Sequence, residues 1–369
     1  MRGLSLDQCD HRTALSAAEV IQELLACKAT FAAFKVPGRD TIVQVQHDQV
    51  LHAPRTGEGA FVIAPFTGDA VCIRPDIELS TASERSSLEG MAIRYEMPAT
   101  PLAGTRGLDR NGYRTAVERA VAAIKTGPLE KVVLSRTMEV DLARIDIGGL
   151  YSAAALSMPD ACIALIHTAE HGTWIGASPE RLLVMHGDHV QVDALAGTMP
   201  SMTGMTMAAW GAKEREEQEL VARSVLQTMH EQGVLDQKTD GPATVIAGRV
   251  AHLRTRITGR SLKEDPLALA NALHPTPAVG GTPRTEAMRL IHALEPRDRS
   301  LYAGFWGPMD GHGAEFFVNI RCMQVIGTVG VLHVGAGITA GSDPDRECDE
   351  VELKARTWLD LIEAQRRTG

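Results

Sequence analysis

The chain has 369 residues, of which 44% are hydrophobic and 22% are charged, so it can form one large domain or two ordinary ones and is not an intrinsically disordered chain. Its 37 Lys and Arg against 46 Asp and Glu give a net charge of −9, and only 4% of its residues are aromatic. This balance, with no basic run, argues against nucleic acid or an anionic membrane surface as a partner.

The six cysteines are scattered and form no CxxC pair, which excludes a zinc ribbon or a disulfide framework and favours a reducing compartment. The first residues, MRGLSLDQCDHRT, contain no apolar stretch that could act as a signal peptide. The apolar runs stay far below the roughly 20 residues of a membrane span. We therefore expect a cytoplasmic protein without a membrane partner.

The first 105 residues give weak patterns. Apolar spacing predicts a helix over residues 17–26 and short strands over 41–45 and 60–63. Residues 97–107 carry two prolines and two glycines, which is typical of a linker. We expect residues 1–105 to be the N-terminal part of one large structural domain, together with the core that follows at 106–369.

The patterns become stronger after this segment. A helix is predicted over residues 109–125, and Gly127 and Pro128 end it. Strands follow at residues 131–140, 161–168, 173–177, 181–185 and 189–193. The last two flank His186-Gly187-Asp188, which is typical of a hairpin turn.

The second half of the chain opens with a long helix predicted over residues 213–231. Two strands, 314–326 and 329–336, are joined by a turn at Gly327 and Thr328, and a helix over 346–364 closes the chain. Hairpins therefore stand where a parallel sheet would need βαβ units. We predict an α+β fold in which large antiparallel sheets pack together with helices on the outside.

Two pairs of glutamates have a spacing that could bind a metal ion. Glu214 and Glu217 lie three residues apart on the predicted long helix, and Glu347 and Glu350 lie three apart at the start of the last helix. This spacing puts both carboxylates of a pair on one helix face. Four carboxylates brought together would attract a hard cation such as Mg²⁺, which leaves coordination sites open for an anionic ligand. The alternative is a pair of solvated helix faces.

Three further features could bind an anion or a substrate. Lys354 lies one helical turn after Glu350 and either forms an ion pair with it or meets a substrate carboxylate. Residues 335–341 (GAGITAG) do not have the spacing of a dinucleotide-binding loop, and a strand end whose backbone N–H groups approach an anion explains them better. His274 lies in a rigid, proline-rich loop and is either a site residue or a structural corner.

A series of short motifs occurs along the chain in a fixed order. They are KVVLSR at 131–136, ASPERL at 177–182, LAGT at 195–198, KEREE at 213–217, HPTPAVGG at 274–281, YAG at 302–304, NIR at 319–321, GAGI at 335–338 and ECDE at 347–350. The series resembles the chorismate-utilising enzymes, the family of anthranilate synthase component I, and most closely the isochorismate synthases. The resemblance covers about residues 109–365 and implies a chorismate-binding catalytic core there.

The resemblance implies a role for individual residues. The implied Mg²⁺ ligands are Glu217 and Glu350, with support from Glu214 and Glu347. The implied substrate-binding residues are Gly197, Thr198, His274, Tyr302, Arg321, Gly335, Gly337 and Lys354. The first two offer backbone N–H groups to the ring carboxylate of chorismate, which also binds the metal. Tyr302, Arg321, the two later glycines and Lys354 meet the enolpyruvyl carboxylate.

The chemistry that the resemblance implies needs two proton-transfer groups. In isochorismate synthesis, water adds at C2 of chorismate and the C4 hydroxyl leaves, so one group must take a proton and another must give one. Lys131 matches the general base of the family and Glu180 matches its general acid. The lysine must then be neutral and the glutamic acid protonated, and burial favours both states. Without the resemblance, an edge-strand lysine and a polar hairpin residue are the alternatives.

The residue type at position 131 also distinguishes branches of the family. Members that aminate chorismate generally carry glutamine at this position and need a glutamine amidotransferase. We expect water as the nucleophile, no amidotransferase subunit, and a monomer rather than an oligomer. Salicylate synthases share the lysine but go on to eliminate pyruvate, so salicylate formation is the alternative. In either case the product would feed menaquinone or siderophore synthesis.

Two interpretations from other classes stay open. A nicotinamide-binding oxidoreductase is supported by residues 335–341 alone, and a chorismate-binding protein without turnover would share the site. Two positions depart from the family pattern: Gly280, where cysteine is usual, and Gln218, where histidine is usual. Neither departure removes a proton-transfer group or a direct metal ligand.

Overall fold

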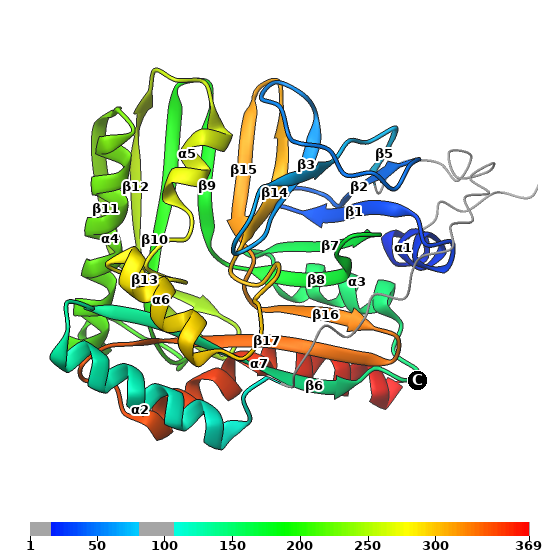
Figure 1. Cartoon of the computed structure of the whole chain (residues 1–369). Helices are drawn as coiled ribbons and strands as arrows, with labels where there is room; N and C mark the ends of the chain where they lie inside the picture. The colour runs from blue at the N-terminus through cyan, green and yellow to red at the C-terminus, as the bar shows by residue number, and fades with distance from the viewer. Residues whose placement is uncertain (1–15, 81–106, 369) are drawn as a thin grey trace, which may run out of the picture.

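The computed structural model describes residues 16–80 and 107–368, and two large antiparallel sheets form its centre (Figure 1). The nine-stranded sheet contains, in spatial order, β13 (Gly281–Thr282), β6 (Lys131–Asp141), β17 (Val329–Ile338), β16 (Cys322–Ile326), β8 (Gly172–Ser178), β7 (Cys162–Thr168), β1 (Thr30–Lys35), β2 (Ile42–Gln46) and β5 (Ile77–Ser80). The eight-stranded sheet contains β11 (Val234–Ala247), β12 (Val250–Ser261), β10 (His189–Pro200), β9 (Arg181–His186), β15 (Gly313–Val318), β14 (Phe305–Asp310), β3 (Ala60–Ala64) and β4 (Val71–Ile73).

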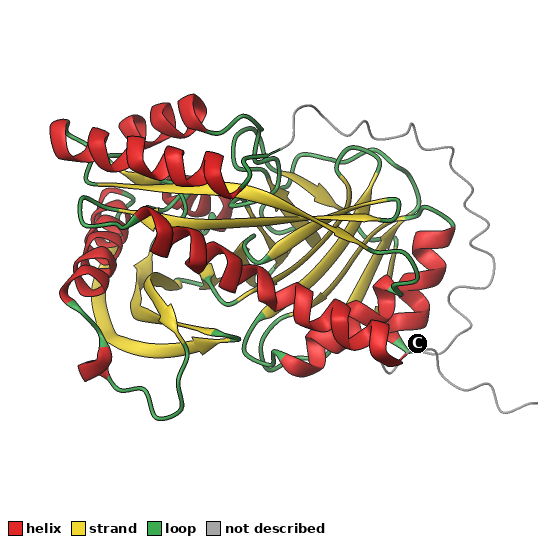
Figure 2. Ribbon diagram, turned by 90° about the horizontal axis from the view of Figure 1, so that it is seen from below, coloured by secondary structure: helices red, strands yellow, loops and turns green. Residues whose placement is uncertain are grey.

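Helices cover the outside of these sheets, as Figure 2 shows. They are α1 (Ala17–Ala26), α2 (Arg110–Thr126), α3 (Ile147–Ser157), α4 (Ala212–Glu231), α5 (Pro266–Leu273), α6 (Arg284–Leu294) and α7 (Pro344–Thr368). Helix α4 packs on β10 and β12, and α7 packs on β17 with α2 beside it. The predicted α+β architecture is therefore confirmed. Within the described ranges, no helix has both the length and the apolar character that a membrane crossing requires.

The predicted helices form for the reasons that the sequence suggests. Helix α2 begins after Asp109, the first residue of the predicted range, whose side chain caps it by accepting a hydrogen bond from the backbone N–H of Gly112 at 2.7 Å. Helix α4 buries the apolar stripe that its periodicity predicts, including Leu220 and Val225. The central strands β7 and β8 are buried along their whole length, because the sheet is covered on both faces.

The first part of the chain contributes strands to both sheets. Strand β1 pairs with β7, and β3 pairs with β14. Residues 30–80 thus hydrogen-bond directly with strands that lie much later in the sequence. The linker predicted at 97–107 lies outside the described residues, except for Gly107.

One predicted element is wrong. The single strand expected at 314–326 is two strands, β15 and β16, which belong to different sheets. The chain turns between them at Arg321, whose φ is +50°. The carbonyl of Arg321 accepts hydrogen bonds from the indole N–H of Trp358, at 2.6 Å, and from the backbone N–H of Ala177, at 3.0 Å. These contacts from distant segments hold a conformation that residues other than glycine rarely adopt.

Candidate active site

Two adjoining cavities lie between α4, α7 and the strands of both sheets. The inner cavity, of about 60 Å³, is lined by many of the predicted residues, namely Glu180, Thr198, Glu217, Tyr302, Arg321, Gly335, Gly337 and Lys354. The outer cavity, of about 370 Å³, is lined by Thr198 and by Lys213, Glu214, Glu347 and Glu350. Thr198 borders both cavities, so they adjoin. Small-molecule sites ordinarily measure about 300–1,000 Å³, which the inner cavity does not reach, so a ligand would extend across the inner and the outer cavity.

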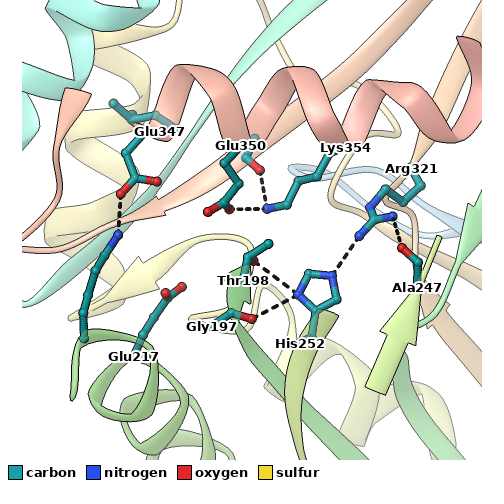
Figure 3. Close-up of polar contacts among 12 residues, drawn as sticks. Gly197, Thr198, Glu217, Ala247, His252, Arg321, Glu347, Glu350 and Lys354 are labelled. Atoms are coloured by element: carbon teal, nitrogen blue, oxygen red, sulfur yellow. Dashed lines mark hydrogen bonds and ion pairs between the residues drawn. The ribbon is translucent and has the colours of Figure 1, made fainter. Parts of the chain in front are cut away.

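The outer end of this site carries the predicted acidic residues. Glu217 points from α4, and Glu347 and Glu350 point from α7, toward a common space (Figure 3). Each carboxylate has a lysine partner: Lys213 Nζ lies 2.6 Å from Glu347, Lys354 Nζ lies 2.8 Å from Glu350, and Lys131 Nζ lies 3.0 Å from Glu217. As they stand, no three His, Cys, Asp or Glu side chains of the described residues form a metal-binding group.

The chemistry of these carboxylates nevertheless fits a cation. Burial, and after it the charge of Glu350, raise the pKa of Glu347 to about 7, although Lys213 works against this shift. A positive ion placed beside two neighbouring carboxylates stabilises their charged forms. Glu347 and Glu350, with Glu214 and Glu217 on the facing helix, are the residues that could hold a hard divalent cation.

Lys131 and Glu180 are two buried ionisable residues at the inner cavity: Glu180 lines it, and Lys131 lies behind Gly337 of its lining. Lys131 opens β6 and is fully buried; a Cβ on Gly337 would lie only 2.9 Å from its Cε, so the glycine leaves room for the lysine. Glu180 follows β8 and is 3% exposed. Burial raises the pKa of Glu180 to about 8, although the nearby charge of Lys131 works against this shift. At neutral pH the Glu180 carboxyl group therefore keeps its proton.

The inner end of the site carries cationic and N–H groups. Lys354 Nζ donates a hydrogen bond to the carbonyl of Gly335 at 2.9 Å. A Cβ on Gly335 would lie 2.6 Å from the hydroxyl of Tyr302, so only glycine fits beside this tyrosine. Arg321 is buried, and burial lowers its pKa to about 10. The guanidinium stays charged at neutral pH, so this end of the cavity can bind an anion.

His252 is a central residue of the site that sequence reasoning missed. The guanidinium of Arg321 donates to its Nε2 at 2.8 Å, so Nδ1 carries the proton and donates to the carbonyl of Gly197 at 3.1 Å. Nδ1 also lies 3.2 Å from the hydroxyl of Thr198. Burial, and then Arg321, hold the pKa of His252 well below its usual value. One neutral imidazole thus connects the Gly197 bulge of β10 with the arginine (Figure 3).

His274 does not line either cavity. Its Nε2 lies 3.1 Å from the carbonyl of Phe66, and its ring packs edge-on against Phe66 and Phe305. Burial lowers its pKa to about 4. These contacts are those of a residue that packs the proline-rich loop, and a substrate-binding role for His274 stays a prediction.

Comparison with known proteins shows the family. A model of the chorismate binding enzymes matches residues 76–363, which is more than half of the chain. The chain belongs to the chorismate binding enzymes. Isochorismate synthase EntC of Escherichia coli strain K12 is 32% identical over 265 residues, which cover 69% of this chain and 68% of EntC.

Solved chorismate binding enzymes share the whole fold. The crystal structure of DhbC from Bacillus anthracis superposes with a TM-score of 0.76 at 26% identity and covers 94% of this chain and 99% of that chain. MenF from Escherichia coli superposes with a TM-score of 0.76 at 22% identity and covers 95% of this chain and 92% of that chain. The two-sheet architecture therefore extends over the N-terminal strands, beyond the region where the motifs lie.

The two departures from the family pattern leave the site of this chorismate binding enzyme intact. Gln218 is buried, and its side-chain amide donates to the hydroxyl of Thr255 at 2.6 Å. Gly280 is part of the proline-rich loop, where a Cβ would lie 3.3 Å from Pro275. Gln218 thus fixes α4 against β12, and Gly280 directly follows Val279, which lines the inner cavity.

Proposed function

We propose that the protein is an isochorismate synthase that converts chorismate to isochorismate. One observation carries the proposal: a buried glutamic acid that keeps its proton, Glu180, lines a cavity with an anion-binding end, and a buried lysine, Lys131, lies next to Gly337 of the same lining. Its similarity to EntC, at 32% identity, supports the same activity. The product would enter siderophore or menaquinone synthesis.

In the proposed reaction, one of the two buried groups takes a proton and the other gives one. Lys131 takes a proton from the water that adds at C2, and Glu180 gives its proton to the hydroxyl that leaves C4. Arg321, Tyr302 and Lys354 hold the enolpyruvyl carboxylate. His252 keeps Arg321 and the Gly197–Thr198 segment in place, so both ends of the substrate are oriented before proton transfer.

We further propose that the site takes Mg²⁺, held by Glu217 and Glu350 with support from Glu214 and Glu347. When bound, the ion supplies positive charge for the ring carboxylate of the substrate. The support comes from the raised pKa of Glu347 and from the three lysines that now neutralise this group. Lys213 and Lys354 have flexible side chains, so they can exchange their partners for a ligand.

Product analysis tests the proposed activity directly. Incubation of the protein with chorismate and Mg²⁺, with and without ammonia, is expected to yield isochorismate in both cases when the products are identified by NMR. Salicylate would select the alternative, in which pyruvate elimination follows. Anthranilate in the presence of ammonia, or no turnover at all, would contradict the proposal.

The Glu350→Gln variant tests the metal site. We expect the Mg²⁺ concentration for half-maximal activity to rise by about ten-fold or more, because a charged ligand becomes neutral. Calorimetric titration with Mg²⁺ gives a second measurement that does not depend on turnover. Glu352→Gln is the matched control, since Glu352 lies on the same helix and pairs with Arg110 at the surface. An unchanged Mg²⁺ requirement in Glu350→Gln would rule out this ligand.

A further inference from the structure

A large cavity of about 730 Å³ lies on the far side of Arg321 from the active site. Its walls come from both sheets: the end of β11, two residues of β12, the start of β9, and the segment between α3 and β7. Four arginines line it, namely Arg181, Arg254, Arg256 and Arg321. In a chain of net charge −9, such a concentration of guanidinium groups in one cavity needs an explanation.

The arginines of β12 point into this cavity because of strand alternation. His252, Arg254 and Arg256 occupy every second position of β12, so their side chains lie on the same face of this strand. His252 reaches the active site, and the two arginines continue the row away from it. The row therefore runs from the substrate site into the second cavity.

Two acidic residues lie opposite Arg256 on the neighbouring strands: Asp193 of β10 and Asp240 of β11, which is exposed. Asp193 of β10 is buried, and its carboxylate oxygens lie 4.0 Å from Arg254 and 3.9 Å from Arg256, beyond hydrogen-bond distance. Within the described ranges, neither Arg256 Nε nor Asp193 Oδ2 has a hydrogen-bond partner. The other acidic residue of the lining, Asp160, is exposed. Three guanidinium groups thus share one buried carboxylate that none of them contacts closely.

Arg321 connects this cavity with the active site. One guanidinium nitrogen donates to His252 on the active-site side, and the other lies 3.4 Å from the carbonyl of Ala247, at the end of β11. Figure 3 shows these two partners on either side of the guanidinium. An anion in the second cavity would therefore approach a residue that also borders the active site.

We propose that the cavity lined by Arg181, Arg254 and Arg256 is a binding site for a small multivalent oxyanion, separate from the active site. A guanidinium group can donate two parallel N–H hydrogen bonds to a pair of oxygens of either a carboxylate or a phosphate. Arg254 and Arg256, two residues apart on one strand, are placed to hold such a ligand together. The proposal concerns binding alone and does not depend on the reaction proposed above.

Calorimetric titration of the full chain with citrate and, separately, with inorganic phosphate at constant ionic strength tests the site. We expect binding of one anion per chain, with the affinity lowered about ten-fold or more in Arg256→Gln. Arg119→Gln, which removes the same charge from an exposed position of α2, should bind as the wild type does. Preference for citrate or for phosphate would identify the ligand as a polycarboxylate or a phosphate compound.

The Asp193→Asn variant should change the affinity for the anion in the opposite direction. Removal of the one buried carboxylate beside the arginines should tighten anion binding, a result that loss of folding cannot produce. Thermal unfolding of each variant monitors the fold. Binding that is absent in the wild type, or that is equal in Arg256→Gln and the wild type, would overturn the proposal; the second result would place the anion in the active site or elsewhere.

Discussion

Lys131→Ala is expected to lower kcat by about a thousand-fold, while chorismate and Mg²⁺ still bind. The Lys131 side chain is fully buried and its Nζ lies 3.0 Å from Glu217, so no solvent group can replace it as the base. Lys354 cannot take over, because the proposed reaction uses it to hold the enolpyruvyl carboxylate. Isochorismate formation measured by NMR, with chorismate binding measured by calorimetry, separates the loss of chemistry from the loss of binding.

Lys125→Ala is the control for this variant, since it removes an exposed lysine at the end of the neighbouring helix α2. It should keep the wild-type rate and the wild-type unfolding temperature. If Lys131→Ala makes isochorismate at a near wild-type rate, Lys131 is not the base. If it loses substrate and Mg²⁺ binding together with activity, the lysine acts through its contact with Glu217 instead.

Glu180→Gln is expected to lower kcat by about a hundred- to ten-thousand-fold, because glutamine keeps the shape of the side chain but has no proton to give. The wild-type pH profile provides a second test. Burial raises the pKa of Glu180 to about 8, and the proton-donating form is the one present below this pKa. Activity should therefore fall as the pH rises through about 8, which kcat measured between about pH 6 and 9.5 will show.

The exposed Glu139, on β6, provides the matched control. Glu139→Gln should leave both the rate and the pH profile unchanged. Residual activity in Glu180→Gln that still falls near pH 8 would assign that pH dependence to another group. A wild-type rate in Glu180→Gln would remove Glu180 from the mechanism.

The amphipathic helices and the hairpins were predictable because their signals are local. Helix α2 shows a cap, an apolar stripe and a glycine stop within one segment, and β16 and β17 are joined by a two-residue turn. The break between β15 and β16 was not predictable, because residues 314–326 form one largely apolar run. Contacts from Trp358 and Ala177, far away in the sequence, hold Arg321 in its unusual conformation.

The residues of the candidate site were predictable where they belong to sequence motifs. They were not predictable where a single side chain stands outside any motif. Glu180 and the glutamate pairs line the two cavities, and Lys131 is buried next to Gly337 of the inner one. Each was predictable as a candidate because it belongs to a motif of the family, and its role stays a prediction. The sequence pattern suggested His274, because it lies in a proline-rich loop. It did not suggest His252, which lies in strand β12 outside any motif. No local pattern marks His252, because β12 also carries arginines and threonines, and its partners, Gly197 and Arg321, lie 55 and 69 residues away.

By itself, then, the sequence determined the fold class, the family and the residue types that the chemistry requires, because these follow from local periodicity and from motif order. The tertiary structure alone decided which groups are buried and what stands beside them. Burial raises the pKa of Glu180 and lowers that of His252, lysines neutralise the glutamates, and strand alternation places Arg254 and Arg256 together. These properties depend on distances between segments that are remote in sequence, which only the folded chain establishes.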